Sequence, residues 1–185
     1  GVALLIDPQK IVETLAEKFT LPAGRGQLLK GINNSIIIDS SYNASREPVV
    51  GSLELLKVVS DNKLKIAVLG DMRELGKQAK VEHEVVAKKI METADKTILV
   101  GPLMKKYVLP ILEQNGFRAK WFATAGEAAI YSKNNLPKNS VVLIKGSQNT
   151  IFLEIVVEAL LVDKEDVNKL CRRGKFWDRQ RAAFI

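Results

Sequence analysis

The stretch Ile36-Ile37-Ile38-Asp39-Ser40-Ser41-Tyr42-Asn43-Ala44-Ser45 decides the fold of this chain. Its isoleucine run predicts a strand buried on both faces, because a half-solvated strand would alternate apolar and polar residues. The strand stops at a cluster of small polar side chains, and a helix is expected directly after it. In open α/β sheets ligands bind beyond the carboxyl ends of strands, so residues 39–45 are a candidate binding site.

Strands and helices alternate from this turn onward. The expected strands are residues 65–69, 97–100, 120–122 and 140–144, and the expected helices are residues 47–59, 81–93, 104–114, 125–133, 150–161 and 163–170. Pro110 predicts a bend in its helix. Repeated strand–helix–strand units predict a Rossmann-like α/β fold, with a mostly parallel sheet and helices on both faces.

The residues before the turn predict a short helix and a β-hairpin. Asp7-Pro8 has the pattern of a helix start, and Ile11, Leu15 and Phe19 then lie on one helical face. Two apolar runs, residues 28–32 and 35–39, flank Asn33-Asn34, which tolerates a left-handed turn.

Composition favours a globular intracellular protein. The chain has 185 residues, of which 46% are hydrophobic and 26% charged, which suits one full domain and a smaller part. Its single cysteine, Cys171, excludes a disulfide framework and is expected to be a buried, inert thiol. No apolar run reaches the roughly 18 residues of a membrane span, and the first six residues lack the basic region of a signal peptide. We therefore expect a cytoplasmic chain that does not contact a membrane.

The formal net charge of +7 is concentrated near the carboxyl end. The cations there are Arg172, Arg173, Lys175, Arg179 and Arg181. We interpret this cluster as a solvated tail. Nucleic-acid binding needs aromatic side chains interleaved among cations, and only Phe176 and Trp177 lie here. We therefore expect no nucleic-acid partner.

Three strand ends carry glycine or polar residues: Asp39-Ser40-Ser41, Gly70-Asp71-Met72 and Lys145-Gly146-Ser147. In a parallel sheet these ends share one edge, where they could hold a charged small molecule. Each turn taken alone is better explained by a serine or aspartate that caps the next helix, and only for the three together are the two interpretations even. The residues by themselves leave both interpretations open.

The chain has no phosphate-binding loop of the nucleotide-hydrolysing type. That loop requires four residues between its glycines, followed by lysine and a hydroxyl residue. Residues 70–78 place five residues between Gly70 and Gly76 and end in Gln78. Gly24-Arg25-Gly26 likewise does not extend to a dinucleotide fingerprint.

Several motifs resemble one known family in the same order along the chain. Residues 38–45 resemble the Asp-Asp-Ser-Tyr-Asn-Ala-Asn-Pro signature of the Mur ligases, with Ser40 in place of the second aspartate. Pro22-Ala23-Gly24-Arg25 resembles a preceding Pro-x-Gly-Arg, and residues 66–76 are very similar to the family's next strand and loop. His83 and Lys145-Gly146-Ser147, with Glu154, also match. The chain is similar to the Mur ligase family, in the branch that adds D-alanyl-D-alanine.

The resemblance implies the last part of a larger ligase. Residues 1–32 would be the end of the central ATPase domain and a hinge, and residues 33–185 the carboxy-terminal domain. Amino-terminal and central domains, absent from this sequence through truncation or a split gene, would be its partners and would carry the phosphate loop. Such an enzyme uses ATP and Mg2+ to phosphorylate UDP-N-acetylmuramoyl-tripeptide, and D-alanyl-D-alanine then attacks the acyl phosphate. The isolated chain is expected to be inactive.

The resemblance also implies site residues. Those expected to face the nucleotide are Arg25, Asp39, Ser40, Tyr42 and Asn43, and those expected to hold the dipeptide are Asp71, Lys145 and Ser147. No catalytic residue and no metal ligand are expected in this chain, and His83 is interpreted as structural. The alternative function is a free-standing nucleotide- or peptide-binding module without ligase activity.

Overall fold

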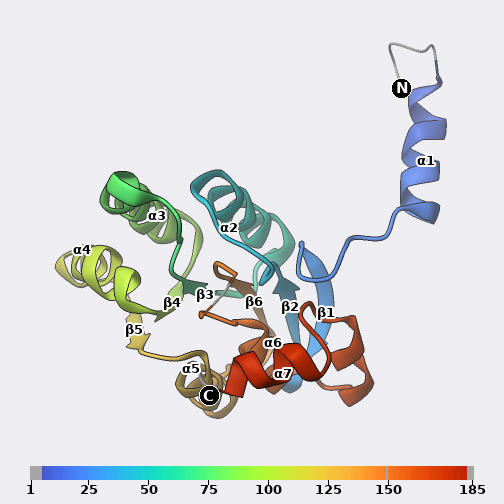
Figure 1. Cartoon of the computed structure of the whole chain (residues 1–185). Helices are drawn as coiled ribbons and strands as arrows, with labels where there is room; N and C mark the ends of the chain where they lie inside the picture. Colours follow the sequence, from blue (N-terminus) through green and yellow to red (C-terminus); the bar gives the residue numbers. More distant parts are fainter. Residues whose placement is uncertain (1–5, 149, 183–185) are drawn as a thin grey trace.

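A six-stranded sheet organises the computed structural model, which describes residues 6–148 and 150–182 (Figure 1). Residues 1–5, considered above for a signal peptide, lie outside the described residues. The strand order is β1-β2-β6-β3-β4-β5. The strands are β1 (Gln27–Gly31), β2 (Ser35–Asp39), β3 (Leu64–Gly70), β4 (Lys96–Val100), β5 (Ala119–Phe122) and β6 (Ser140–Lys145). β1 is antiparallel to β2, and the other neighbouring pairs are parallel, as expected.

Helices cover both faces of the sheet and bury a separate core on each (Figure 1). On one face lie α2 (Arg46–Ser60), α3 (Ala79–Thr93), the π-helical turn η4 (Met104–Val108) and α4 (Leu109–Gln114). On the other lie α5 (Ala125–Asn135) and α6 (Glu154–Leu160). β2, β3 and β6 present apolar side chains to both cores, which explains why Ile36–Ile38 do not alternate with polar residues.

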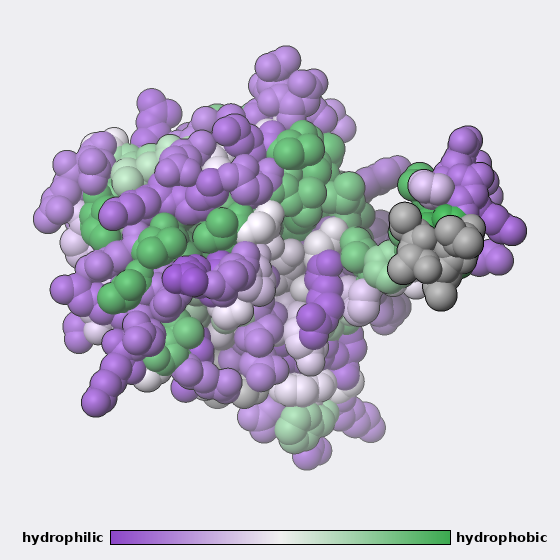
Figure 2. Space-filling model, turned by 90° about the horizontal axis from the view of Figure 1, so that it is seen from above, coloured by the Kyte–Doolittle hydropathy of each residue, from purple (hydrophilic) through white to green (hydrophobic). Residues whose placement is uncertain are grey.

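The hairpin and the first helix form as the sequence predicts. β1 and β2 are joined by a short 3-10 turn, η2 (Ile32–Asn34), in which Asn33 and Asn34 have φ values of 58° and 56°. α1 (Pro8–Lys18) begins where the Asp7 carboxylate accepts the backbone N–H of Gln9 at 2.9 Å. Figure 1 shows α1 standing away from the sheet, and in Figure 2 the same segment forms a separate lobe beside the main body. The division of the chain between residues 32 and 33 stays a prediction, and the hairpin bonds β1 directly to β2.

The helix expected over residues 150–161 is shorter than predicted, since α6 spans Glu154–Leu160. Thr150 and Phe152 adopt left-handed backbone, with φ values of 65° and 48°. This turn seats the Ile151 side chain against Gly70, where an added Cβ would lie only 2.4 Å from Ile151 Cγ2. Close packing at a glycine therefore overrides the local helical pattern.

The bend or restart predicted near Pro110 coincides with the junction between η4 and α4. Three further differences concern helices. Residues expected to form an α-helix over 163–170 form the 3-10 helix η5 (Lys164–Lys169). The carboxyl end adds an unexpected helix, α7 (Lys175–Arg181), and 3-10 turn η3 (Gly76–Gln78) precedes α3. Among the described residues, none of these helices is long and apolar enough to cross a membrane.

Candidate functional site

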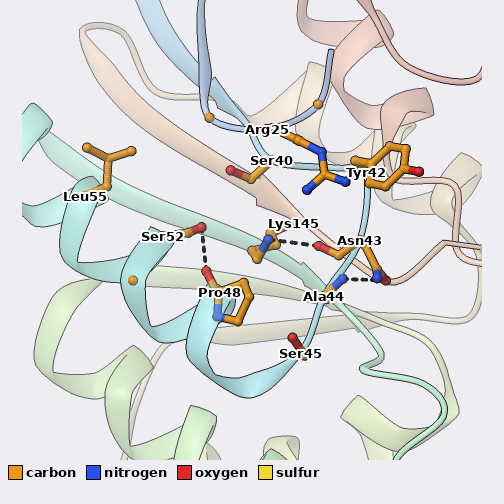
Figure 3. A pocket seen from close by; sticks show the side chains of 13 residues that line it. Arg25, Ser40, Tyr42, Asn43, Ala44, Ser45, Pro48, Ser52, Leu55 and Lys145 are labelled. Carbon is orange, nitrogen blue, oxygen red and sulfur yellow. Dashed lines mark hydrogen bonds between the residues drawn. The ribbon is translucent and has the colours of Figure 1, made fainter. Parts of the chain in front are cut away.

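A cavity of about 410 Å³ opens at the carboxyl ends of β2 and β6 (Figure 3). The helix after β2 lies on one face of the sheet and the helix after β6 on the other. Neighbouring strands whose connections diverge in this way leave a crevice at which α/β proteins bind ligands. The cavity is lined by Gly24, Arg25, Gly26, Ser40, Tyr42, Asn43, Ala44, Ser45, Pro48, Gly51, Ser52, Leu55 and Lys145.

The loop before β1 contributes a cation to this cavity. Gly24 accepts the backbone N–H of Tyr42 at 3.0 Å, and the N–H of Gly26 donates to the carbonyl of Asp39 at 2.7 Å. These bonds fix the loop beside the end of β2. The Arg25 guanidinium consequently lies over the Tyr42 ring, 4.3 Å from its centroid, and both side chains border the cavity (Figure 3).

Lys145, the last residue of β6, supplies a second cation. Its side chain is only 6% exposed, and its Nζ donates to the carbonyl oxygen of Asn43 at 2.9 Å. The pKa of Lys145 is lowered to about 8, mainly by burial and also by the nearby charge of Arg25, while Asp39 opposes both effects. A buried lysine whose charged form is disfavoured by a neighbouring guanidinium marks a place where a bound anion would be stabilised.

The turn after β2 is held in shape by its own polar groups. Asn43 Oδ1 accepts the backbone N–H of Ala44 at 2.8 Å and that of Gln148 at 3.4 Å. The N–H of Ser40 donates to the carbonyl of Ile144 at 2.9 Å, so the turn follows the end of β6. Ser40, Tyr42 and Asn43 all line the cavity, as the sequence predicts for a binding turn.

Asp39 does not line the cavity. Its side chain is completely buried, with Oδ1 accepting the Ser41 N–H at 3.0 Å and Oδ2 lacking any partner among the described residues. Burial raises the pKa of Asp39, and the bonds from Ser41 only partly offset that rise. The carboxylate therefore shapes the turn and the charge balance of Lys145 from inside the protein.

The three polar strand ends do share one edge. The Ser147 N–H donates to the carbonyl of Asp71 at 3.1 Å, and Ser147 Oγ donates to the carbonyl of Ala44 at 3.3 Å. Ser147 Oγ also accepts the N–H of Arg73 at 2.9 Å. The Asp71 carboxylate accepts the N–H groups of residues 103 and 104 at 3.1 and 2.8 Å. Of the residues expected to hold the dipeptide, Lys145 lines the cavity and Asp71 and Ser147 do not.

His83 is buried and joins α3 to the loop after β3. Its Nε2 accepts the N–H of Met72 at 3.2 Å, so the ring proton lies on Nδ1, which donates to the carbonyl of Ala79 at 2.6 Å. Burial lowers the pKa of His83, consistent with a neutral ring. His83 thus holds α3 against the loop after β3, and the expectation that it has no catalytic role stays a prediction.

Sequence reasoning missed a buried ionic network behind the turn. Arg172 donates to Glu154 from Nε at 2.8 Å and from Nη2 at 2.7 Å, and Arg181 donates to the carbonyl of Arg172. Glu154, Arg172 and Arg181 are all buried. The expectation of a solvated tail is wrong for these two arginines, because their partners come from α6 and from the distant turn after β2. The sequence signal for the network is Glu154, an acid beside the apolar run 155–157.

The described residues offer no metal centre. Among residues 6–148 and 150–182, no three histidine, cysteine, aspartate or glutamate side chains lie close enough to hold a metal ion. Cys171 is buried beside Ser41, and burial raises the pKa of its thiol, so it is an inert thiol as expected.

Comparison with known proteins gives one consistent family. The family described as Mur ligase, glutamate ligase domain, matches residues 24–148. The chain is 34% identical over 162 residues to a UDP-N-acetylmuramoyl-tripeptide--D-alanyl-D-alanine ligase of Rickettsia prowazekii, covering 84% of this chain and 35% of that protein.

Solved structures agree with this match. A MurF structure from Acinetobacter baumannii aligns with a TM-score of 0.69 and 25% identity, covering 85% of this chain and 35% of that one. MurF ligase from Thermotoga maritima in complex with ADP aligns in fold with a TM-score of 0.62 and 23% identity, covering 86% and 36%. The chain spans about a third of the length of these relatives. It therefore belongs to the Mur ligase family and corresponds to the family's carboxy-terminal domain.

Proposed function

We propose that this chain is the nucleotide-closing domain of an ATP-dependent ligase that adds D-alanyl-D-alanine to UDP-N-acetylmuramoyl-tripeptide through an acyl phosphate. The observation that carries the proposal is the convergence of Arg25 and Lys145 on one cavity, beside the hydroxyl of Ser40. The relatives named above support the substrate assignment, and the ADP complex of one fold neighbour supports the nucleotide.

The cavity residues fit a nucleotide chemically. Arg25 can donate paired hydrogen bonds to phosphate oxygens, whereas Lys145, a compact charge in the same cavity, is left for the carboxylate of the incoming dipeptide. Ser40 and Asn43 offer hydrogen-bonding groups for a ribose, and the Tyr42 ring offers an apolar surface next to Arg25. Bound ATP would supply the phosphoryl group that activates the substrate carboxylate. The residues of this chain would neutralise its charge and exclude water from the hydrolysable intermediate.

Mg2+ and the phosphate loop are assigned to a central ATPase domain of the same cytoplasmic enzyme, because this chain spans only about a third of the length of its relatives. An amino-terminal domain would bind the UDP-sugar. Lys145 is the strongest candidate for the dipeptide carboxylate, because the polar atoms of Asp71 and Ser147 already bond within the chain.

The test is Arg25→Gln in the longer ligase that contains this chain. We expect the KM for ATP to rise about tenfold, the factor of one charged hydrogen bond, with little change in kcat. Lys30→Gln, which removes an exposed cation outside the cavity, is the matched control and leaves the KM unchanged.

A comparison of the longer ligase with the 185-residue chain alone distinguishes the ligase hypothesis from the hypothesis of a free-standing binding module. The 185-residue chain alone is expected to form no ADP in the presence of D-alanyl-D-alanine. Equal KM values for Arg25→Gln and the control would contradict the nucleotide assignment. Tight ATP binding by the chain alone, with no ligase activity in the longer protein, would establish the module.

A further inference from the structure

A second cavity, of about 360 Å³, lies at the amino ends of β3, β4 and β5. Because these strands run parallel to β2 and β6, this edge is opposite to the one that carries Arg25 and Lys145. The two cavities share no lining residue. The second cavity is lined by Ile66, Lys96, Thr97, Ile98, Arg118, Ala119, Lys120, Tyr131, Asn135 and Pro137.

Strand register brings three cations to this cavity. Lys96 pairs with Ile66, and Lys120 pairs with Ile98, so each lysine shares a sheet face with its isoleucine partner. Arg118 precedes Lys120 by two positions and follows the same alternation. Ile66 and Ile98 belong to the core under α5, so the cations occupy the helix-covered face at its open end.

These cations have no acidic partner in the part of the chain that the structure describes. The lining contains no aspartate or glutamate. Asp95, the neighbour of Lys96 in sequence, is paired with Lys65 instead. Lys65 Nζ lies 3.1 Å from Asp95 Oδ2, and the backbone N–H of Lys65 donates to the same oxygen at 2.8 Å. Three like charges around one opening repel one another, and a bound anion would relieve that repulsion.

The floor of the cavity is apolar and continues inward. Ile66, Ile98, Tyr131 and Asn135 also line an inner chamber of about 20 Å³, whose other walls are mostly aliphatic. Ser132 lines this chamber, is 3% exposed, and has no hydrogen-bond partner for its Oγ among the described residues. A buried hydroxyl without a partner is costly, and a ligand atom reaching the chamber would satisfy it.

From the cations at the mouth, the apolar floor and the unpartnered hydroxyl beneath, we infer that this cavity binds a small amphipathic anion. The ligand has a phosphate or carboxylate head, held by Lys96, Arg118 and Lys120, and an apolar body that packs on Ile66, Ile98 and Tyr131. The volume is that of small-molecule sites in general. The site is separate from the cavity proposed for the nucleotide, because the two share no lining residue.

The experiment uses the 15N-labelled full chain and hexyl phosphate as the probe. We expect saturable amide shift changes at residues 96–98, 118–120 and 131–135. Hexanoate distinguishes a carboxylate preference from a phosphate preference, whereas hexanol and inorganic phosphate each carry half of the proposed chemistry and should bind at least tenfold more weakly. Shift changes confined to residues 24–45, or equal binding of hexanol or inorganic phosphate, would overturn the inference.

A variant pair completes the test. The double variant Arg118→Gln/Lys120→Gln changes two exposed side chains and should weaken hexyl phosphate at least tenfold. Lys133→Gln/Lys138→Gln removes the same charge from exposed positions outside the lining and should leave binding unchanged. If the two double variants weakened hexyl phosphate binding equally, the effect would come from net charge alone and the proposed site would be wrong.

Discussion

Arg172 donates from Nη1 to the carbonyl oxygen of Tyr42 at 2.8 Å, across 130 positions of sequence. Its Nη2 donates to the carbonyl of Ser41 at 2.7 Å, while the same guanidinium pairs with buried Glu154. One side chain thus bonds the carboxyl-terminal segment to the turn that borders the cavity containing Arg25 and Lys145. Arg172 itself has φ of 54°, a left-handed conformation that these bonds hold in place.

Replacing Arg172 with methionine should destabilise the chain by about 3–5 kcal/mol, because Glu154 would remain buried without its main partner. The measurement is urea unfolding followed by tryptophan fluorescence. Arg179→Met, at an exposed position, should change stability by less than about 0.5 kcal/mol. The double variant Glu154→Met/Arg172→Met should be more stable than Arg172→Met alone, since it no longer leaves the Glu154 carboxylate buried without its main partner. Equal stability of the single and double variants would contradict this account.

The lowered pKa of Lys145 predicts that the chain becomes more stable at alkaline pH. Its pKa is about 8 in the folded chain against 10.5 for an ordinary lysine, so the unfolded chain binds more protons between these values. The cost of the buried charge is fully present below pH 8 and disappears as pH approaches 10.5. The free energy of unfolding should therefore increase across this window by at most about 3 kcal/mol.

Lys145→Met provides the reference for that measurement. The difference in unfolding free energy between this variant and the native chain isolates Lys145 from other groups that titrate above pH 8. We expect the advantage of the variant to shrink as pH rises. A difference that stays constant from pH 7 to pH 10 would show that the lysine titrates as if exposed.

The lowered pKa of His83 predicts a loss of stability at acidic pH. Burial lowers its pKa below the ordinary 6.5, so the unfolded chain binds more protons between the two values and stability falls as pH drops below about 6.5. The chain contains a single histidine, so its imidazole resonance is unambiguous in proton NMR. The titration midpoint should lie below 6.5, and His83→Gln should lose this component of acid sensitivity. A titration midpoint of the His83 imidazole at or above 6.5 would contradict the assignment of a buried neutral ring.

The sheet could be predicted from the sequence because each strand and the hairpin turn are specified by a short local pattern of residues. The isoleucines at 36–38 and the apolar runs at 65–69 and 140–144 specify buried strands, and Asn33-Asn34 specifies the hairpin turn. Strand ends with small polar residues then locate the edge that carries the cavity, and Lys145 and Asn43 meet there.

The remainder depends on contacts that no local pattern encodes. The start of α6 was mispredicted because Ile151 must reach Gly70, and the arginines near the carboxyl end are buried because Glu154 and the turn after β2 receive them. The position of Asp39 outside the cavity likewise follows from the register of β2 against β6, which directs its side chain into the protein. Charge counts and periodicity carry no information about such distant partners.

The loop that positions Arg25 contains two glycines, Gly24 and Gly26, whose alanine variants control for each other. Gly24 and Gly26 both have left-handed backbone, with φ values of 70° and 91°. A Cβ at Gly24 would lie 3.0 Å from Tyr42 N and 3.1 Å from Cys171 Sγ, whereas a Cβ at Gly26 would meet nothing within 4 Å. Gly26→Ala should therefore cost only the backbone strain, about 1–2 kcal/mol.

Gly24→Ala should cost a further 1 kcal/mol or more, roughly the penalty of overpacking, because the Tyr42 backbone cannot yield without losing its bond to the Gly24 carbonyl. Urea unfolding of both variants measures the two costs. In the longer ligase, Gly24→Ala should also raise the KM for ATP more than Gly26→Ala does, since it displaces Arg25 from the Tyr42 ring. Equal costs and equal KM values would mean that the close approach of Gly24 to the turn has no part in forming the cavity.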